Sequence, residues 1–423
     1  MPKHPKVIKY SAFKGINNIV DAQCTDPAYL KKALNVNIDK LGGIGTRKGY
    51  VKKDTANYSS VWSSENRQGC YAVRNGDLVK LNPDYSFITL LSGIGNEKLS
   101  FEEVDNIIYY TSSNTNGIIF NGVRKEWGMP KNTLSPTLTQ TAGLLVAGTY
   151  QISFTYVRSD GTESGTSKSF IITVTANSGI SVSIPTNPDI SITSARVYCS
   201  TLDGNTLYYA GSASLGTSFI IEDTSNLINP LRAFNLDKAP NGHIVKYHKG
   251  RLYVAEDNIL WYSEPFQYNY FKLDSNYIEF SERIREIMPV EDGLWIGSES
   301  LYFLSGSSPD EFKRNLKEHI KIVEGTSTRI SGSYVHIDNT PIGYKWLVTS
   351  DLGIFILFNQ GLVINLTSAN VELDQANSGT SIFLQDAGIN QYLSILKTNQ
   401  NPNNSVIGDL VETSIVRNGV IIP

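Results

Sequence analysis

The chain has 423 residues, of which 18% are charged, and it contains 34 glycines, 23 tyrosines and a formal net charge of −3. This length allows two or three domains, and the composition favours many short strands and turns over long charged helices. The slightly acidic balance argues against a protein that grips DNA by neutralising phosphates, because such surfaces are usually basic.

The N-terminal segment carries signals for a short helix followed by a hairpin. Asp26-Pro27 has the residue types of a helix start, with aspartate as N-cap and proline at the first helical position, and predicts a helix through Leu34. Residues 35–39 are then expected to form a strand that turns at Gly42-Gly43 into a second strand over residues 44–50.

Signals for export and for membrane insertion are absent from this sequence. The first ten residues, MPKHPKVIKY, lack the apolar stretch of a secretory signal, and no run of 18 apolar residues occurs, so we expect no stable membrane insertion. Cys24, Cys70 and Cys199 lie far apart and form no CxxC pair. We expect them to be free, buried or half-buried thiols, as in a protein assembled in a reducing compartment.

A mid-chain module stands out by its alternating pattern. Residues 150–156 alternate Tyr, Ile, Phe and Tyr with Gln, Ser and Thr, which is the period of a half-buried strand, and Ser159-Asp160-Gly161 then turns the chain. Further short strands with frequent turns predict an antiparallel, Ig-like β-sandwich over residues 133–238. Because an inserted domain leaves and re-enters its host at one place, Thr133 and Lys238 are expected to lie close together.

The flanking regions, residues 1–132 and 239–423, repeat a strand–turn–strand unit. The clearest turns, near Gly250, Gly293 and Gly353, are about 40–60 residues apart, which suits propeller blades of three or four strands. We therefore predict an all-β fold. In it, a β-propeller-like domain is formed by both flanks and interrupted by the inserted sandwich.

No catalytic or metal-binding motif is readable. His243 and His248 flank one strand with odd spacing and no HExxH occurs, so we expect no metal and no cofactor. There is no GxSxG, P-loop or GxGxxG motif. The acidic residues Glu291, Asp292 and Asp351 lie beside turn glycines, where they serve the backbone. We expect no enzymatic activity.

One short stretch, WYSEPFQYNYF, gathers aromatic side chains. Aromatic residues are enriched at protein interfaces and also stack on sugars or bases. We interpret the cluster mainly as interface or blade-edge cover, with ligand stacking as the alternative. The candidate interface aromatics are Tyr262, Phe266, Tyr268, Tyr270 and Phe271.

Several phrases resemble one protein family. FKGINN followed by DPAYLKKALNVNIDKLGGIGTRKGY resembles the opening of tail nozzle or hub proteins of short-tailed bacteriophages, also called tail tubular protein B-like or packaged-DNA stabilisation proteins. GTYQISFTYVRSDGTES, with Arg196-Val197-Tyr198 downstream, is similar to fibronectin-type modules of phage virion proteins. EDGLWIGSESLYFLSG looks like the propeller hairpins of this family. The matching N-terminal residues, which become candidates for adaptor docking or ring contact, are Gly15, Asn17, Asn35, Gly43, Arg47 and Gly49.

The resemblance implies a structural role in the phage tail. It implies a β-propeller subunit of a ring, usually a homo-hexamer, that bounds the DNA channel at the distal end of the virion tail after assembly in the host cytoplasm. It further implies contacts with a head-to-tail adaptor or portal-associated proteins and with tail fibres or spikes. Double-stranded DNA would pass without tight binding. The alternative is a receptor- or glycan-binding tail adhesin component, and a propeller hydrolase comes third.

Overall fold

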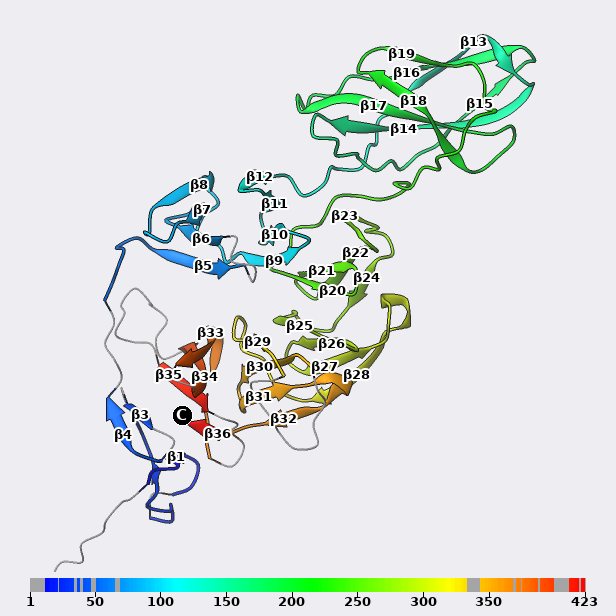
Figure 1. Cartoon of the computed structure of the whole chain (residues 1–423). Helices are drawn as coiled ribbons and strands as arrows, with labels where there is room; N and C mark the ends of the chain where they lie inside the picture. Colours follow the sequence, from blue (N-terminus) through cyan, green and yellow to red (C-terminus); the bar gives the residue numbers. More distant parts are fainter. Residues whose placement is uncertain are drawn as a thin grey trace, which may run out of the picture. The chain divides into compact units, whose positions relative to one another are not determined.

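The structure, a computed structural model, describes residues 12–21, 23–33, 36–38, 41–46, 51–64, 69–332, 343–367, 370–373, 375–386, 389–398, 411–417 and 420–422. These residues form strands and turns, with two short 3-10 helices at Pro309–Glu311 and Asn359–Gly361. The predicted all-β class is confirmed (Figure 1). None of the helices in this described part is long and apolar enough to cross a membrane.

The chain divides into two compact units. The sandwich unit is Asn57–Glu279, and the terminal unit combines Met1–Ala56 with Phe280–Pro423. Each unit contains three antiparallel meander sheets, in which strands that follow each other in sequence mostly lie side by side. Such sheets arise from the repeated short hairpins of the sequence, whose turns use residues that tolerate positive φ, for example Lys249-Gly250 between β20 and β21.

The sandwich unit contributes three meander sheets and the terminal unit another three. The strands of the sandwich unit are β5 (Tyr58–Ser63), β6 (Cys70–Arg74), β7 (Asp77–Leu81) and β8 (Phe87–Leu91), then β9 (Ser100–Val104), β10 (Ile107–Thr111), β11 (Asn116–Phe120) and β12 (Val123–Lys125), then β20 (Ile244–His248), β21 (Arg251–Glu256), β22 (Ile259–Glu264), β23 (Gln267–Phe271) and β24 (Tyr277–Glu279). Those of the terminal unit are β25 (Glu286–Val290), β26 (Gly293–Gly297), β27 (Leu301–Ser305) and β28 (Lys313–Glu318), then β29 (Thr328–Ile330), β30 (Lys345–Ser350), β31 (Gly353–Leu357) and β32 (Val363–Asn365), then β33 (Ala376–Asp386), β34 (Ile389–Thr398), β35 (Val411–Arg417) and β36 (Val420–Ile422).

Hydrophobic cores lie between consecutive sheets rather than inside single ones. Tyr71 of β6 and Tyr110 of β10 share one cluster, which joins the first two sheets of the sandwich unit. Trp295 of β26 and Phe355 of β31 share another in the terminal unit. Stacking of twisted four-stranded meanders through their faces is the packing of propeller blades. The fold is therefore β-propeller-like, as the sequence predicted.

In both units, tryptophan side chains link neighbouring sheets by donating a hydrogen bond to a backbone carbonyl. The indole Nε1 of Trp295 in β26 donates to the Phe358 carbonyl at 2.8 Å, and Trp346 in β30 donates back to Pro289 of β25 at 2.6 Å. In the sandwich unit, Trp127 donates to Tyr268 of β23 at 2.8 Å. Because an indole has one donor and a large apolar body, each contact fixes position while burying area.

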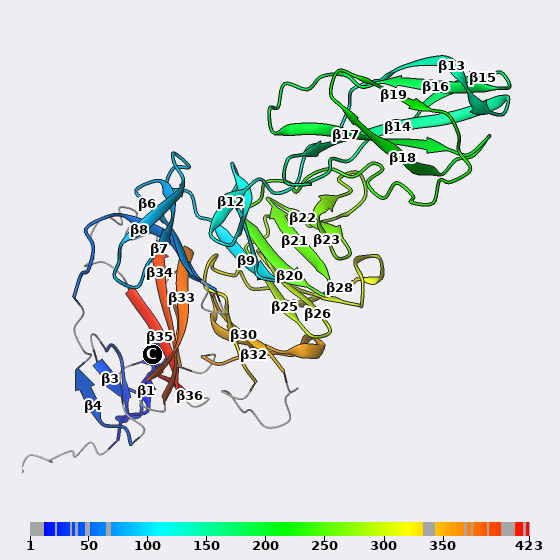
Figure 2. The same cartoon turned by 45° about the horizontal axis from the view of Figure 1, so that its top comes forward.

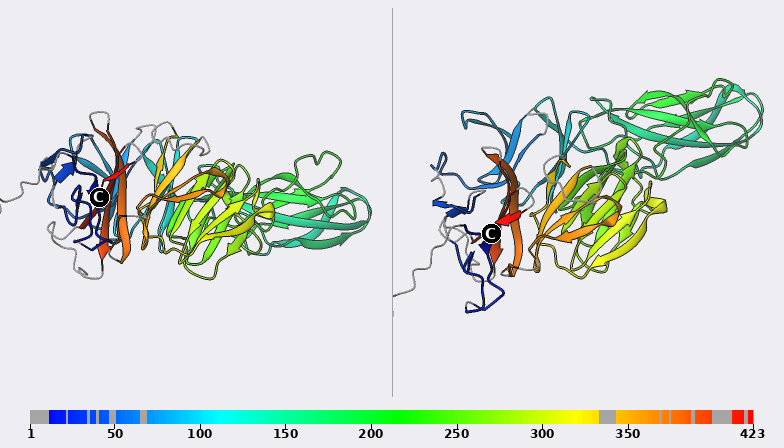
Figure 3. Two further views of the ribbon diagram at one scale, coloured as in Figure 1. Left: turned by 90° about the horizontal axis from the view of Figure 1, so that it is seen from below. Right: turned by 60° about the horizontal axis from the view of Figure 1, so that its bottom comes forward.

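The inserted β-sandwich has two antiparallel sheets packed face to face, which Figures 2 and 3 show from three sides. Their orders are β13-β16-β19 and β15-β14-β17-β18. Tyr150, Ile152, Phe154 and Tyr156 alternate along β14 into the shared core, and each is at most 2% exposed. The predicted alternation is confirmed. The strands are β13 (Thr137–Leu145), β14 (Gly148–Arg158), β15 (Phe170–Val174), β16 (Ser178–Ser183), β17 (Ile192–Ser200), β18 (Leu207–Ser214) and β19 (Ser218–Ile221).

The two ends of the sandwich lie together. The backbone N–H of Lys131 donates to Oδ1 of Asp237 at 3.1 Å, and the Lys131 ammonium donates to Asn235 at 3.2 Å. Asn132 and Phe234 both bridge to Thr166 in parallel. The expectation that the chain leaves and re-enters at one place is confirmed.

Removal of the sandwich is expected to leave its host sheets folded. When a short Gly/Ser linker replaces residues 135–236, the junction made by Lys131 and Asp237 is retained. The sandwich also has a core separate from that of the neighbouring sheets. Circular dichroism should show a cooperatively folded β protein, and limited proteolysis should show no new cleavage within residues 69–128. A molten or insoluble product would show that the two parts depend on one core.

The helix predicted after Asp26 is wrong. The side chain of Asp26 accepts from the backbone N–H of Ala28 at 3.0 Å and so closes a turn. Residues Tyr29–Leu30 (β2) then pair in parallel with Gly15–Ile16 (β1). The following hairpin of β3 (Val36–Ile38) and β4 (Ile44–Thr46) agrees with the prediction for its described residues. Aspartate therefore serves here in an Asx turn, a competing use of the same side chain.

Candidate functional site

Part of the N-terminal motif that was predicted to dock on an adaptor makes contacts within this chain instead. Gly15 lies in β1, and Asn17 is 8% exposed and accepts from the backbone N–H of Val20 at 3.1 Å. Next to it, Asn18 exchanges two hydrogen bonds of 2.8 Å with the backbone of Glu372. Gly43 lies in the exposed turn before β4. Asn35, Arg47 and Gly49 lie outside the described residues.

The five candidate aromatics do not form one exposed patch. Phe271 is fully buried and Tyr262 is 6% exposed, whereas Tyr268 and Tyr270 are half-buried. Only Phe266 among these five projects outward, with 76% of its surface exposed. Phe266 is exposed because it lies in the turn between β22 and β23, at a φ of +56°, whereas the other four aromatics lie within these two strands.

The cysteines are free, as expected, but they differ in exposure. Cys199 is buried in the sandwich core, and burial raises the pKa of its thiol to about 12. Cys70 is half-buried, whereas Cys24 is exposed because it lies in the turn that precedes Asp26. Among the described residues, no three His, Cys, Asp or Glu side chains gather in a way that could hold a metal ion.

The buried imidazole of His248 predicts a pH dependence of stability. The side chain lies at the end of β20, its Nε2 has no hydrogen-bond partner, and burial, with a contribution from the Lys249 charge, lowers its pKa from 6.5 to about 4. The unfolded chain therefore binds a proton below pH 6.5 that the native state takes up only near pH 4. Stability falls as pH falls through this window, by up to about 3 kcal/mol.

The measurement compares urea unfolding of the wild type and of His248→Gln between pH 7 and pH 4. The variant should lose less stability across this window than the wild type, since glutamine does not titrate. Equal losses in both proteins would show that His248 titrates alike in the folded and unfolded states.

A polar cleft lies on the outer face of the sandwich sheet β15-β14-β17-β18, with a cavity volume of about 490 Å³. Its floor follows from strand register: Thr155 of β14 is opposite Arg196 of β17, and Tyr198 of β17 is opposite Tyr209 of β18. Alternation places all four side chains on the face away from the apolar core. Segment 229–233 and β23 form the walls.

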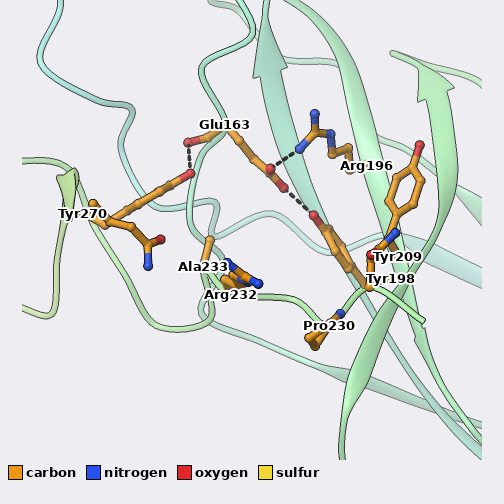
Figure 4. Close-up of a pocket in the computed structure, with 10 residues that line it drawn as sticks. Glu163, Arg196, Tyr198, Tyr209, Pro230, Arg232, Ala233 and Tyr270 are labelled. Carbon is orange, nitrogen blue, oxygen red and sulfur yellow. Dashed lines mark hydrogen bonds and ion pairs between the residues drawn. The ribbon is translucent and has the colours of Figure 1, made fainter. Parts of the chain in front are cut away.

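Glu163 organises this cleft (Figure 4). After the turn at Gly161, the chain folds back over β14 and brings the carboxylate of Glu163 to Arg196, with which it forms an ion pair. Tyr198 donates to Glu163 Oε1 at 2.6 Å and Thr155 donates to the same oxygen at 2.5 Å. The carboxylate is thus fully engaged by partners that the sheet holds in place.

Tyr270 connects the cleft to the neighbouring meander sheet. Its hydroxyl donates to the backbone carbonyl of Glu163 at 2.9 Å, and burial together with the Glu163 charge raises its pKa to about 12. Burial and the same carboxylate also raise the pKa of Tyr198, so both phenols stay protonated and can act as donors. Gln267, also on β23, completes this wall.

Sequence reasoning singled out Tyr270 but missed the rest of the cleft. Arg196 and Tyr198 occur in one quoted phrase, and their i, i+2 spacing places both on one strand face. Glu163 and Arg232 reach the cleft through loops, and no periodic signal marks them.

No family model matches the sequence, and no curated protein matches it. Among solved structures, the chain is similar to BBS1N in complex with ARL6DN, with 9% identity over 81% of this chain and 90% of that chain and a TM-score of 0.32. It is also similar to the WD40 domain of SCAP from fission yeast (10% identity, 86% and 73%, TM-score 0.26) and to Kluyveromyces lactis Hsv2 (8% identity, 82% and 95%, TM-score 0.28). TM-scores this low do not indicate a shared function.

Proposed function

We propose that this chain is a non-enzymatic structural protein of a phage tail: a nozzle or hub ring subunit that bounds the DNA channel, retains the packaged genome and allows its ejection. The observation that carries the proposal is the order of modules. Meander sheets come first, an inserted β-sandwich follows, and further meander sheets close the chain. The resemblance to tail nozzle proteins implies a β-propeller subunit, and the inserted sandwich contains the phrase that is similar to fibronectin-type modules of phage virion proteins. Identical subunits would close the ring through heterologous contacts repeated around one axis.

The hairpin β3–β4 is the part that we propose docks on a head-to-tail adaptor or portal-associated protein. All three residues of β4 are exposed, and Leu41 in the preceding turn is 86% exposed. Because Asn17 and Asn18 tie the neighbouring segment to residues 370–372, the hairpin projects from an anchored base. Tail fibres or spikes would bind elsewhere on the ring, which we place in the virion tail.

The charge of the chain agrees with a channel through which DNA slides. Six subunits of formal charge −3 sum to −18. A channel wall with a net negative charge binds few phosphates. A passing duplex therefore releases few counterions and gains little binding affinity. We expect the pure protein to bind duplex DNA no more tightly than about micromolar at physiological salt.

Imaging of intact virions with this chain located tests the proposal. We expect a six-fold ring at the distal end of the tail, and we expect particles that lack the chain to package DNA but to lose it on storage. Three results would each contradict the channel role. These are particles that lack the chain and still keep their DNA, a chain that is monomeric in virions, and salt-sensitive DNA binding by the pure protein at nanomolar concentration.

A second candidate function, a receptor- or glycan-binding tail component, is favoured by the Glu163 cleft. This cleft brings three tyrosines together with arginine and amide side chains, which is the composition of many polar ligand sites. Binding of any saccharide that the cleft variant Tyr209→Ala abolishes would support it.

A further inference from the structure

We infer that the Glu163 cleft binds a carboxylated saccharide. The inference rests on the second candidate function, glycan binding, and adds to it the charge of the ligand and the residue that reads this charge. It is independent of ring assembly, because all of the lining residues belong to the sandwich unit of one chain.

The electrostatics of the cleft favour an anion. The Glu163 carboxylate is already engaged by Arg196, Tyr198 and Thr155, so its charge is compensated before any ligand enters. Arg232 lines the same cleft, is exposed, and has no ion-pair partner among the described residues. The charged lining residues, two arginines and one glutamate, therefore sum to +1.

A carboxylate is an anionic group that suits this positive charge. The guanidinium is a planar fork that matches the two carboxylate oxygens in a bidentate pair. The charge of Arg196 is already paired with Glu163, so Arg232 supplies the net positive charge of the cleft.

The remaining lining groups suit a sugar ring. Tyr209 lies on the floor with its ring edge-on to Tyr198, the centroids 5.9 Å apart, and its hydroxyl contacts Ser212 at 2.9 Å. Such rings offer apolar faces on which the C–H side of a pyranose packs. Asn229 and Gln267 add amides that both donate to and accept from hydroxyl groups. An inorganic anion would contact only the guanidinium. A uronic acid would contact the guanidinium with its carboxylate, the tyrosine rings with its C–H groups and the amides with its hydroxyl groups.

Calorimetric titration of the full chain with trigalacturonate tests the inference, and its methyl ester is the matched neutral ligand. We expect the acid to bind more tightly than the ester. Arg232→Gln should weaken binding of the acid about ten-fold, the effect of one charge-assisted hydrogen bond, and should leave the ester unchanged. Tyr209→Ala should weaken both ligands. Arg314→Gln, an exposed arginine of β28 outside the cleft, is the control and should change neither.

Several results would overturn the inference, and they are distinguishable from failure of glycan binding itself. Equal affinity for acid and ester, each weakened by Tyr209→Ala, would keep a glycan site and remove the charge requirement. Sulfate competing as strongly as trigalacturonate would indicate a plain anion site. Hexaglutamate binding more tightly than the sugar would indicate a protein partner. Absence of binding by either sugar to the folded wild type would overturn the inference, whereas the second candidate function would fail only if other saccharides also do not bind.

Discussion

Replacing Trp295 with alanine is expected to lower the free energy of unfolding of the terminal unit by about 3–5 kcal/mol, the range for truncation of a large buried aromatic side chain. The indole is fully buried and packs on Phe303 with ring centroids 4.9 Å apart. Its loss leaves a cavity between two meander sheets and an unpaired Phe358 carbonyl. Hydrogen exchange should show the loss of protection in peptides from both sheets, residues 286–318 and 345–365.

Two further variants separate the contributions of Trp295. Trp295→Phe retains most of the ring and removes the N–H donor, so it should cost about 1–3 kcal/mol. Trp261 is half-buried and donates within its own region to Glu256 at 2.9 Å, and Trp261→Ala should cost less than Trp295→Ala. Similar costs for both alanine variants would contradict the role of Trp295 as a fastener between sheets.

Replacing Glu163 with alanine is expected to destabilise the sandwich unit by about 4 kcal/mol, because it removes three charge-assisted contacts at once. Arg196 would then lack its counter-ion, and the hydroxyls of Tyr198 and Thr155 would lose their acceptor. Tyr198 is 6% exposed and Thr155 is fully buried, so water cannot fully replace the lost carboxylate as their acceptor. Chemical denaturation followed by Tyr and Trp fluorescence measures the loss.

The ion pair of Lys125 with Asp160 provides the matched control. It spans 3.3 Å with side chains 39% and 31% exposed, and exposed pairs contribute about 0–1 kcal/mol. Lys125→Ala should therefore change stability far less than Glu163→Ala. A cost below about 1 kcal/mol for Glu163→Ala would show that the carboxylate network is marginal to folding.

The sheets could be predicted from sequence because their causes are local. A glycine such as Gly250 or Gly161 with positive φ marks a turn, and alternation on either side marks the strands that the turn joins. The same reasoning succeeded for the closeness of the sandwich ends, since it follows from topology alone.

Where the structure depends on residues that are distant in the sequence, the prediction was wrong or no prediction could be made. The pairing of β2 with β1 depends on strands a dozen residues apart and overrode the helix signal at Asp26. The cleft depends on loops that bring Glu163, Arg232 and Gln267 onto one sheet face. Neither arrangement has a periodic signature along the chain.

The adjoining ends of the sandwich bear on how this protein can change over evolutionary time. Since Lys131 and Asp237 meet at one point, recombination that exchanges the segment between them replaces a whole module without re-routing the host chain. A foreign β-sandwich with similarly adjacent termini would meet the same geometric requirement. The contacts that such an exchange must rebuild include the one from Tyr270 to the backbone of residue 163, the ion pair of Lys125 with Asp160 and the hydrogen bond from Arg158 to the Gly128 carbonyl. The insertion point is thus a natural site at which binding specificity can be replaced while the meander sheets are inherited unchanged.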